Sequence, residues 1–328
     1  METKTDMVQK MQRKLLKNTD IEISEICLGL SLIGTESSEN DAFEMLDHFL
    51  DAGGNLLDTA RFYANWIPGE NGRSERILGD YLRKRRNRDK FVICSKGCHP
   101  HWESMSQKRV NPQAYAEDLN ASLKALGTDH IDLYLLHRDD PAVPVEVLLE
   151  AMEEARRSGK IREYGISNWK SARIRELTDA AAARQYRGIR ADQELINYGC
   201  MSHNPPWDPD TEAWDHSYPD ILRQADCAIM AYSGQAAGFF HKVNAGEDPA
   251  KAGDYYNTPE NIRRAAALQK LSLESGLSIS SLLLKYLLQA ETLQIIPIVR
   301  GIDKKQLEQI LETLDDTVID FGSLRDFE

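Results

Sequence analysis

Four polar residues of different chemistry follow short apolar runs of this chain. Asp58, Lys96 and His137 stand at the ends of three such runs, and Tyr63 comes five residues after Asp58. A phenol has an ordinary pKa of about 10 and becomes a better acid where a nearby cation favours its ionised form. Lys96 can be that cation, with Asp58 as its counter-ion, and His137 can hydrogen-bond a carbonyl oxygen or relay a proton. Each residue alone also has a structural explanation, but the four together indicate protonation of a carbonyl group.

The elements that must position these side chains form a repeated pattern. Eight apolar runs, each followed by polar or glycine-containing residues and most then by a helical pattern, cover residues 26–30, 55–58, 91–95, 131–137, 163–166, 189–193, 227–232 and 294–299. Such alternation predicts parallel strands joined by helices. We therefore predict a (β/α)8 TIM barrel, in which the carboxyl ends of the strands form one working face.

Helix and turn signals support this arrangement. Helices are predicted over 38–52, 112–127 with Asn111 as the cap, 171–183, 258–276, 278–290 and 303–314. The segments 13–17 and 21–24 flank Asn18-Thr19-Asp20 and predict an N-terminal β-hairpin that closes the bottom of the barrel. Residues 204–218, rich in Pro, Asp, His and Trp, and the long interval after the seventh strand predict extended loops at the carboxyl face.

Length, composition and charge set wider limits. The 328 residues allow about two domains by length, but a barrel of this kind forms one, so a single domain over 1–328 is expected. A content of 41% apolar and 28% charged residues is typical of globular proteins. The 40 basic and 52 acidic residues give a net charge of −12, which disfavours nucleic acid and anionic membranes as partners.

The apolar stretches and the cysteines indicate a cellular compartment. The first residues contain no apolar secretion signal, and the apolar stretches fall short of a membrane span. The five cysteines are odd in number and lie mostly in apolar runs, so we expect reduced thiols in a cytoplasmic protein.

Several short motifs, in their order along the chain, resemble the signatures of the aldo-keto reductases. They are Asp58-Thr59-Ala60-Arg61-Phe62-Tyr63, Ser74-Glu75-Arg76-Ile77-Leu78-Gly79, Ser95-Lys96-Gly97, Asp132-Leu133-Tyr134-Leu135-Leu136-His137, Gly165-Ile166-Ser167-Asn168 and Gln193. The resemblance extends from the N-terminal hairpin to Arg300. It implies a (β/α)8 barrel that uses a nicotinamide dinucleotide, with Tyr63 as general acid, Lys96 and Asp58 as its tuning pair, and His137 at the substrate carbonyl.

The same resemblance assigns residues to the cofactor. The chain has neither a G-x-G-x-x-G fingerprint after a strand nor a P-loop, so the late loops of the barrel would have to bind the dinucleotide. The resemblance implies that the nicotinamide carboxamide is held by Ser167, Asn168 and Gln193, that the ring stacks on Tyr232, that the pyrophosphate lies along Ser233 and Gly238, and that the adenosine 2′-phosphate faces Arg300.

Two departures from the family pattern bear on the cofactor. Tyr232-Ser233 is followed by Gly234-Gln235-Ala236 where Pro-Leu-Gly is usual, so the pyrophosphate loop is expected to differ in shape. Gln306, with Gln309 or Ile310, stands where a second basic residue and an adenine-binding Asn are common. Arg300 favours NADPH as the cofactor, and the absence of the second basic residue leaves NAD possible as well.

Aromatic residues surround the expected carbonyl site. The sequence places there Phe62, Trp66, Trp102, Trp169, Trp207 and Trp214, interleaved with His101, Arg138 and Asn197. Phe62, Trp66, Trp102 and Arg138 are expected to line the substrate pocket, although each tryptophan could instead pack under a loop. Aromatic faces beside polar groups suit a sugar-like or cyclic carbonyl compound. No metal is expected, because Cys98-His99-Pro100-His101 matches no standard zinc spacing.

Three functions fit these features. The first is an active carbonyl reductase or alcohol dehydrogenase, and the second is a cofactor-binding regulatory subunit that works through a partner on the same barrel. The third is a barrel enzyme without redox chemistry, such as an isomerase. The residues expected at the nicotinamide disfavour the isomerase, and the lack of an interaction domain disfavours the regulatory subunit. The substrate, the favoured direction and the oligomeric state stay open.

Overall fold

Eight parallel strands close into a barrel in the computed structural model, which describes residues 11–35, 38–204, 218–300, 304–314 and 317–322. Around the ring they follow the order β10, β3, β4, β5, β6, β7, β8, β9. Their bounds are β3 Cys27–Gly29, β4 Leu56–Asp58, β5 Val92–Gly97, β6 Ile131–Leu136, β7 Ile161–Ser167, β8 Ala191–Leu195, β9 Ala228–Tyr232 and β10 Ile295–Val299. All eight predicted strands are present, and the predicted (β/α)8 barrel is confirmed.

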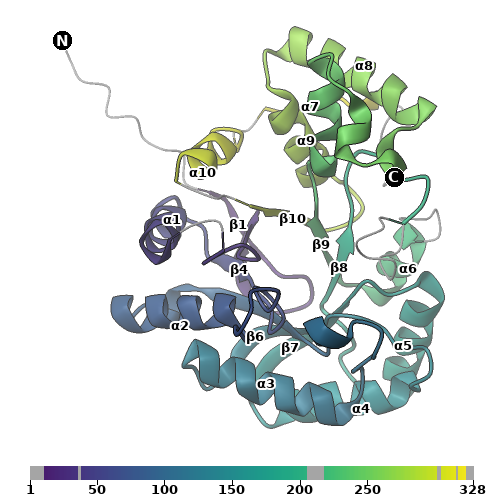
Figure 1. Cartoon of the computed structure of the whole chain (residues 1–328). Coiled ribbons are helices and arrows are strands. Elements are labelled where there is room, and N and C mark those ends of the chain that lie inside the picture. The colour runs from purple at the N-terminus through teal and green to yellow at the C-terminus, as the bar shows by residue number, and fades with distance from the viewer. Residues whose placement is uncertain (1–10, 36–37, 205–217, 301–303, 315–316, 323–328) are drawn as a thin grey trace.

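Helices surround the strands, as Figure 1 shows. They are α1 Glu39–Asp51, α2 Arg73–Arg85, α3 Pro112–Leu126, α4 Val145–Arg157, α5 Ser171–Ala183, α6 Tyr218–Ala225, α7 Phe239–Asn244, α8 Pro259–Ser275, α9 Ile279–Leu288 and α10 Lys304–Leu311. The predicted helix starts are found: Ser38 forms a capping box with Asp41, and the Asn111 side chain accepts a hydrogen bond from the amide of Ala114. Gly127 ends α3 in the left-handed conformation.

The N-terminal hairpin closes one end of the barrel, as predicted. Strands β1 (Arg13–Leu15) and β2 (Glu22–Ser24) pair antiparallel. Leu16, Ile21 and Ile23 of this hairpin region belong to the same buried cluster as residues inside the barrel. The hairpin therefore covers the amino-terminal end of the strands and leaves the carboxyl end for the polar side chains.

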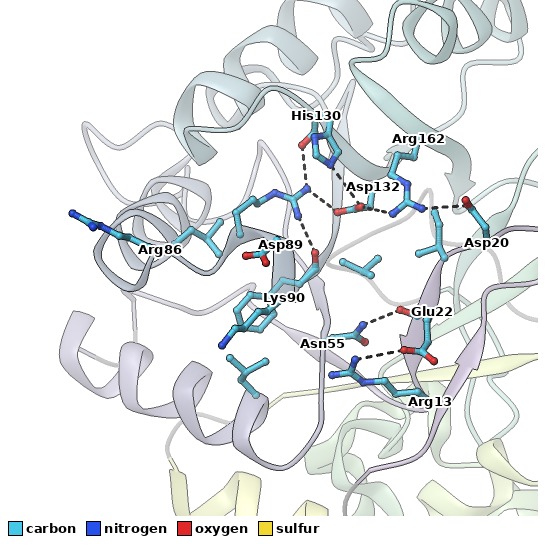
Figure 2. A pocket seen from close by; sticks show the side chains of 16 residues that line it. Arg13, Asp20, Glu22, Asn55, Arg86, Asp89, Lys90, His130, Asp132 and Arg162 are labelled. Carbon is cyan, nitrogen blue, oxygen red and sulfur yellow. Dashed lines mark hydrogen bonds and ion pairs between the residues drawn. The ribbon is translucent and has the colours of Figure 1, made fainter.

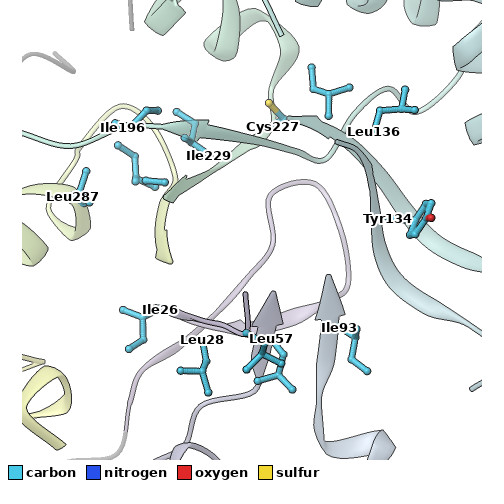
Figure 3. Packing of buried hydrophobic residues seen from close by; sticks show 14 of the residues in the cluster. Ile26, Leu28, Leu57, Ile93, Tyr134, Leu136, Ile196, Cys227, Ile229 and Leu287 are labelled. Carbon is cyan, nitrogen blue, oxygen red and sulfur yellow. The ribbon is translucent and has the colours of Figure 1, made fainter. Parts of the chain in front are cut away.

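Side chains along each strand point alternately into the barrel and outward toward the surrounding helices, so they form two buried clusters. Ile26, Leu28, Leu57, Ile93 and Tyr134 belong to the outer cluster, part of which is drawn in Figure 3. The alternate positions point inward, including Val92 and Cys94 on β5 and Leu133 and Leu135 on β6. Continuing this alternation directs Lys96 and His137 to the inner face at the carboxyl ends of β5 and β6.

None of the described helices is long and apolar enough to cross a membrane by itself. Helices α8 and α9 meet that length and composition only when they are counted together across a bend of 100°.

The close approach of β6, β7 and β8 requires a glycine at position 165. A Cβ added there would lie 2.2 Å from the carbonyl oxygen of Ala191 and 2.6 Å from Cδ2 of Leu135. We predict that Gly165→Ala lowers the free energy of unfolding by about 1–3 kcal/mol, because the strands must move apart. Urea denaturation measures this change. The control, Gly127→Asn, changes a left-handed helix end with no atom within 4 Å of the added Cβ and should cost less than about 1 kcal/mol. Equal losses in the two variants would contradict the explanation.

Candidate active site

A buried ion pair forms the centre of the site. The Nζ atom of Lys96, from β5, lies 2.7 Å from Oδ1 of Asp58, at the end of β4. The same ammonium donates to the carbonyl oxygen of Thr59 at 2.9 Å and to the hydroxyl oxygen of Tyr63 at 3.0 Å. All three of its donors are used, and the Lys96 side chain is fully buried. Three of the four residues selected from the sequence therefore meet at one point.

Burial and the charge of Lys96 shift the pKa of the Tyr63 hydroxyl in opposite directions. Burial raises the pKa of Tyr63 to about 12, although the charge of Lys96 lowers it. Lys96 thus acts in the expected direction, but desolvation of the phenolate outweighs it, so the phenol stays protonated at neutral pH. Burial lowers the pKa of Lys96, but the charges of Asp58, Tyr63 and Cys94, together with the hydrogen bond to Asp58, outweigh burial and hold that pKa above its usual range. The ammonium is therefore charged inside the barrel.

His137 completes the group from the end of β6. Its ring centroid is 5.8 Å from that of Tyr63, in an edge-to-face arrangement. Burial lowers the pKa of His137 well below its usual range, and the charges of His99, Arg138 and Lys96 act in the same direction. The imidazole is therefore neutral. Its Nδ1 atom is buried and has no hydrogen-bond partner in the part of the chain that the structure describes.

A chain of hydrogen bonds joins the ion pair to the residues expected at the nicotinamide. Nε2 of Gln193, on β8, donates to Oδ1 of Asp58 at 2.8 Å. The Ser167 hydroxyl donates to the carbonyl oxygen of Gln193 at 2.8 Å, and Nδ2 of Asn168 donates to that hydroxyl at 2.9 Å. The Tyr232 hydroxyl then donates to Oδ1 of Asn168 at 2.6 Å. The structure thus brings together the four side chains that the family resemblance assigns to the nicotinamide.

The loop after β9 and the end of β10 contain the remaining expected cofactor residues. Ser233, Ala236, Ala237 and Gly238 all have positive φ, between 48° and 77°. Turns of this kind can direct successive backbone amides toward an anion. Arg300 is exposed directly after β10. These residues are compatible with a phosphate-bearing ligand, but no hydrogen bond between them and the group around Asp58 is present among the described residues.

Phe62 connects most of the aromatic residues expected at the substrate. Its ring centroid lies 3.6 Å from that of His99 and 6.2 Å from those of both Trp66 and Trp102. The ring of His137 is 6.4 Å away. Trp102 is 49% exposed, so the cluster extends from the ion pair's neighbourhood to the surface.

The other polar and aromatic candidates have different surroundings. Trp169 is fully buried, and its indole donates to the carbonyl oxygen of Arg138 at 3.3 Å, so it packs in the core. Nη1 of Arg138 donates to the carbonyl oxygen of His137 at 2.8 Å. Asn197 donates to the Tyr256 hydroxyl, and His101 is exposed. Trp207 and Trp214 lie outside the described residues.

The sequence analysis assigned no role to His99, or to Arg109 and Asp118, which hold its loop. His99 follows Lys96 by three residues and was considered only as part of a metal motif. Arg109 and Asp118 fix its loop through hydrogen bonds to backbone groups. His99 comes shortly after β5, the strand that carries Lys96, and this position could have marked it as a candidate site residue. Within the described ranges, no three His, Cys, Asp or Glu side chains gather as metal ligands.

A hollow of about 710 Å³ lies at the other end of the barrel. Figure 2 shows its charged lining, which includes Asp132 and Arg162 at the starts of β6 and β7. Asp132 accepts hydrogen bonds from Arg88, Arg162 and the amide of Ile93. The polar groups around Asp132 therefore bind one another, and the hollow is separate from the Lys96 centre.

Comparison with known proteins identifies the family. The model described as "Aldo/keto reductase family" matches residues 25–321. The "Uncharacterized oxidoreductase YrpG" of Bacillus subtilis is 28% identical over 254 residues, which cover 74% of each chain. The "Aldo-keto reductase YhdN" of the same organism is 34% identical over 163 residues, so the match spans about half of each chain, 48% of this one and 47% of YhdN.

A relative from a fungus matches over a longer range. The "Norsolorinic acid reductase B" of Dothistroma septosporum is 24% identical over 316 residues, or 91% of this chain and 75% of the relative. The barrel, the order of motifs and the family match agree with one another. The chain belongs to the aldo/keto reductase family and is accordingly an NAD(P)H-dependent oxidoreductase of small carbonyl compounds.

Proposed function

We propose that this protein reduces an aldehyde or ketone with NADPH and that Tyr63 supplies the proton to the carbonyl oxygen. The observation that carries this proposal is the contact of the Tyr63 hydroxyl with the buried Lys96 ammonium at 3.0 Å. The same residues would act in reverse on an alcohol, with Tyr63 as the base. The proposed catalytic residues are Tyr63 and His137. Lys96, held in its charged form by Asp58, stabilises the phenolate of Tyr63.

The residues present fit a nicotinamide dinucleotide. Ser167, Asn168, Gln193 and Tyr232 are joined in one hydrogen-bonded group that reaches Asp58, and their amide and hydroxyl groups are suited to a carboxamide. When bound, the nicotinamide supplies the hydride. We infer that Ser233 and Gly238 lie along the pyrophosphate and that Arg300 binds the 2′-phosphate through its guanidinium.

The geometry around Tyr63 explains how its proton can leave. The ammonium of Lys96 donates to the phenolic oxygen, so the hydroxyl proton of Tyr63 points elsewhere and is available to a substrate. Its contact with Oδ2 of Asp58 is long, at 3.5 Å, and is easily exchanged for a carbonyl oxygen. After transfer, Lys96 stabilises the phenolate at close range. A high pKa keeps the proton on Tyr63 until the substrate oxygen becomes basic.

His137 is proposed to orient the carbonyl oxygen. Its Nδ1 atom has no donor or acceptor beside it among the described residues, whereas a proton on Nε2 can be used by a substrate. A neutral imidazole with its proton on Nε2 donates a hydrogen bond without adding a buried charge. Tyr63 and His137 would then both donate to the same oxygen.

The aromatic residues favour a cyclic substrate. Phe62, Trp66 and Trp102 form the apolar side of the proposed pocket, and Arg138 lies next to His137. A flat or cyclic carbonyl compound can stack on such rings while its oxygen reaches the polar group. The name of the norsolorinic acid reductase relative agrees with a reductive role for this architecture.

The first prediction from the proposed function concerns the proton donor. Tyr63→Phe should lower kcat by about 10² to 10⁴-fold, because only the donated hydroxyl is lost. Steady-state kinetics with a reducible carbonyl compound measures the rate, and quenching of tryptophan fluorescence measures NADPH binding, which should be retained. Unchanged kcat in this variant would refute the proposed mechanism.

The second prediction concerns the buried ion pair. Lys96→Met should lower the free energy of unfolding by about 3–5 kcal/mol, because the Asp58 carboxylate loses the cation that compensates its burial. Lys96→Met combined with Asp58→Asn should be more stable than Lys96→Met alone, since no unpaired charge is left. Urea denaturation of the variants measures both effects. The exposed Lys124→Met is the control and should change stability by less than about 0.5 kcal/mol. A double variant no more stable than Lys96→Met would argue against this account.

The third prediction concerns the choice of dinucleotide. Arg300→Gln should weaken binding of NADPH more than binding of NADH, because only NADPH carries the 2′-phosphate. Loss of a charge-assisted contact of about 1.5–3 kcal/mol corresponds to roughly a 10- to 150-fold rise in Kd. Fluorescence titration with each cofactor measures the two changes. If binding of NADPH and of NADH weakens equally, Arg300 does not contact the 2′-phosphate.

A further inference from the structure

The loop that follows β5 is held rigidly beside the proposed pocket. Asp118, on α3, accepts a hydrogen bond from the amide of Cys98 at 2.8 Å and pairs with Arg109 through both of its oxygens at 3.0 Å. Nη1 of Arg109 also donates to the carbonyl oxygen of His99 at 3.0 Å. This arrangement fixes the backbone on both sides of the bond between Cys98 and His99. The His99 ring therefore has a defined position.

The ring of His99 has a defined tautomer. Its Nδ1 atom lies 2.9 Å from the carbonyl oxygen of Pro100. A carbonyl oxygen only accepts hydrogen bonds, so Nδ1 must carry the proton. Burial lowers the pKa of His99 to about 3, with the charge of Arg138 acting in the same direction, so the ring is neutral. Nε2 of His99 is consequently a hydrogen-bond acceptor.

This acceptor lies next to the proposed proton-donating group. The His99 ring stacks on Phe62 at 3.6 Å and is 4.8 Å from the ring of His137, centroid to centroid. Nε2 of His99 makes no hydrogen bond to another described residue and is not among the buried polar atoms that lack a partner. His99 is only 5% exposed, so Nε2 keeps a small open surface and an unused acceptor position. The carboxylate of Asp58, by contrast, is occupied by Lys96 and Gln193.

We propose that His99 determines substrate specificity by accepting a hydrogen bond at Nε2 from a hydroxyl group that the substrate carries close to its carbonyl carbon. This proposal rests on the proposed carbonyl reduction at Tyr63 and names the substrate class as hydroxy-substituted carbonyl compounds. Tyr63 and His137 donate to the carbonyl oxygen, and His99 accepts from the neighbouring hydroxyl. Because the ring centroids of His99 and His137 are 4.8 Å apart, we place the hydroxyl on the carbon next to the carbonyl group or close to it.

The acceptor atom Nε2 of His99 requires a hydrogen-bond donor on the substrate. A substrate with a hydroxyl satisfies Nε2, whereas a methyl ether of the same shape covers Nε2 without donating to it. A site built around a hydroxyl discriminates against analogues that lack the donor, because a buried polar atom is then left unpaired. A histidine fixed as an acceptor therefore favours the hydroxy compound.

The test compares 2-hydroxyacetophenone with 2-methoxyacetophenone, with NADPH as the reductant. The wild-type protein should give a kcat/KM about tenfold or more higher for the hydroxy compound. His99→Phe keeps an aromatic ring on Phe62 but removes the acceptor, so this ratio should fall to about one while the methoxy compound is still reduced. His99→Gln retains an acceptor oxygen and should keep part of the preference. The matched control is His101→Phe, which changes an exposed histidine two residues away and should keep the full ratio.

The outcomes separate this proposal from the proposed function. A wild-type protein that reduces both compounds equally, or a His99→Phe variant that keeps the preference, overturns the role of His99 but leaves carbonyl reduction intact. A wild-type protein that binds NADPH yet reduces no carbonyl compound overturns both. His99→Leu provides the same comparison if thermal unfolding shows that His99→Phe does not fold. A ratio near one in either variant, with unchanged NADPH binding, supports the role of Nε2.

Discussion

The burial of the Lys96 ammonium is the constraint on which the rest of the site depends. A charge inside a barrel is tolerated only when an opposite charge and hydrogen bonds replace water. Asp58 supplies the opposite charge, and the Thr59 carbonyl oxygen and the Tyr63 hydroxyl oxygen accept hydrogen bonds from the other two N–H groups of Lys96. Gln193 donates to Asp58 from the far side of the barrel. The pair therefore links β4, β5 and β8, and the same contacts that hold the charge place Tyr63.

A second set of interactions holds the aromatic rings that lie next to His137. Asp118 and Arg109 form an ion pair outside the barrel, yet they hydrogen-bond to the backbone of the loop that follows Lys96. Through that loop they fix the ring of His99 against Phe62. In the proposed mechanism, the Lys96–Asp58 pair controls proton transfer at Tyr63, whereas the Asp118–Arg109 pair positions the residues proposed to contact the substrate.

The sequence was sufficient to predict the barrel, because branched apolar runs at regular intervals and capping residues such as Ser38 and Asn111 are local signals. It also predicted that Asp58, Lys96, Tyr63 and His137 lie close together, since polar residues at the carboxyl ends of neighbouring strands meet on one rim. It could not separate Trp102 from Trp169, because exposure depends on packing from distant segments: Trp169 is fully buried and Trp102 is half-exposed. The pKa of Tyr63 was likewise inaccessible, because burial outweighs the neighbouring cation.

Asp132 and the group formed by Tyr63 and His137, at opposite ends of the barrel, differ in how far their hydrogen bonds are satisfied. At the amino-terminal end, Asp132 is saturated by Arg88, Arg162 and a backbone amide, so its charge stabilises the fold. At the carboxyl end, Nδ1 of His137 has no partner among the described residues, and the hydroxyl of Tyr63, which accepts a hydrogen bond from Lys96, donates only through a long contact with Asp58. Leaving such groups unsatisfied costs stability, and a fold selected for stability alone would pair them. Buried polar atoms without a hydrogen-bond partner also occur elsewhere among the described residues, for example on Glu163 and Asp192, but at the carboxyl end they lie close to the buried Lys96–Asp58 pair, where the family resemblance also places the chemistry.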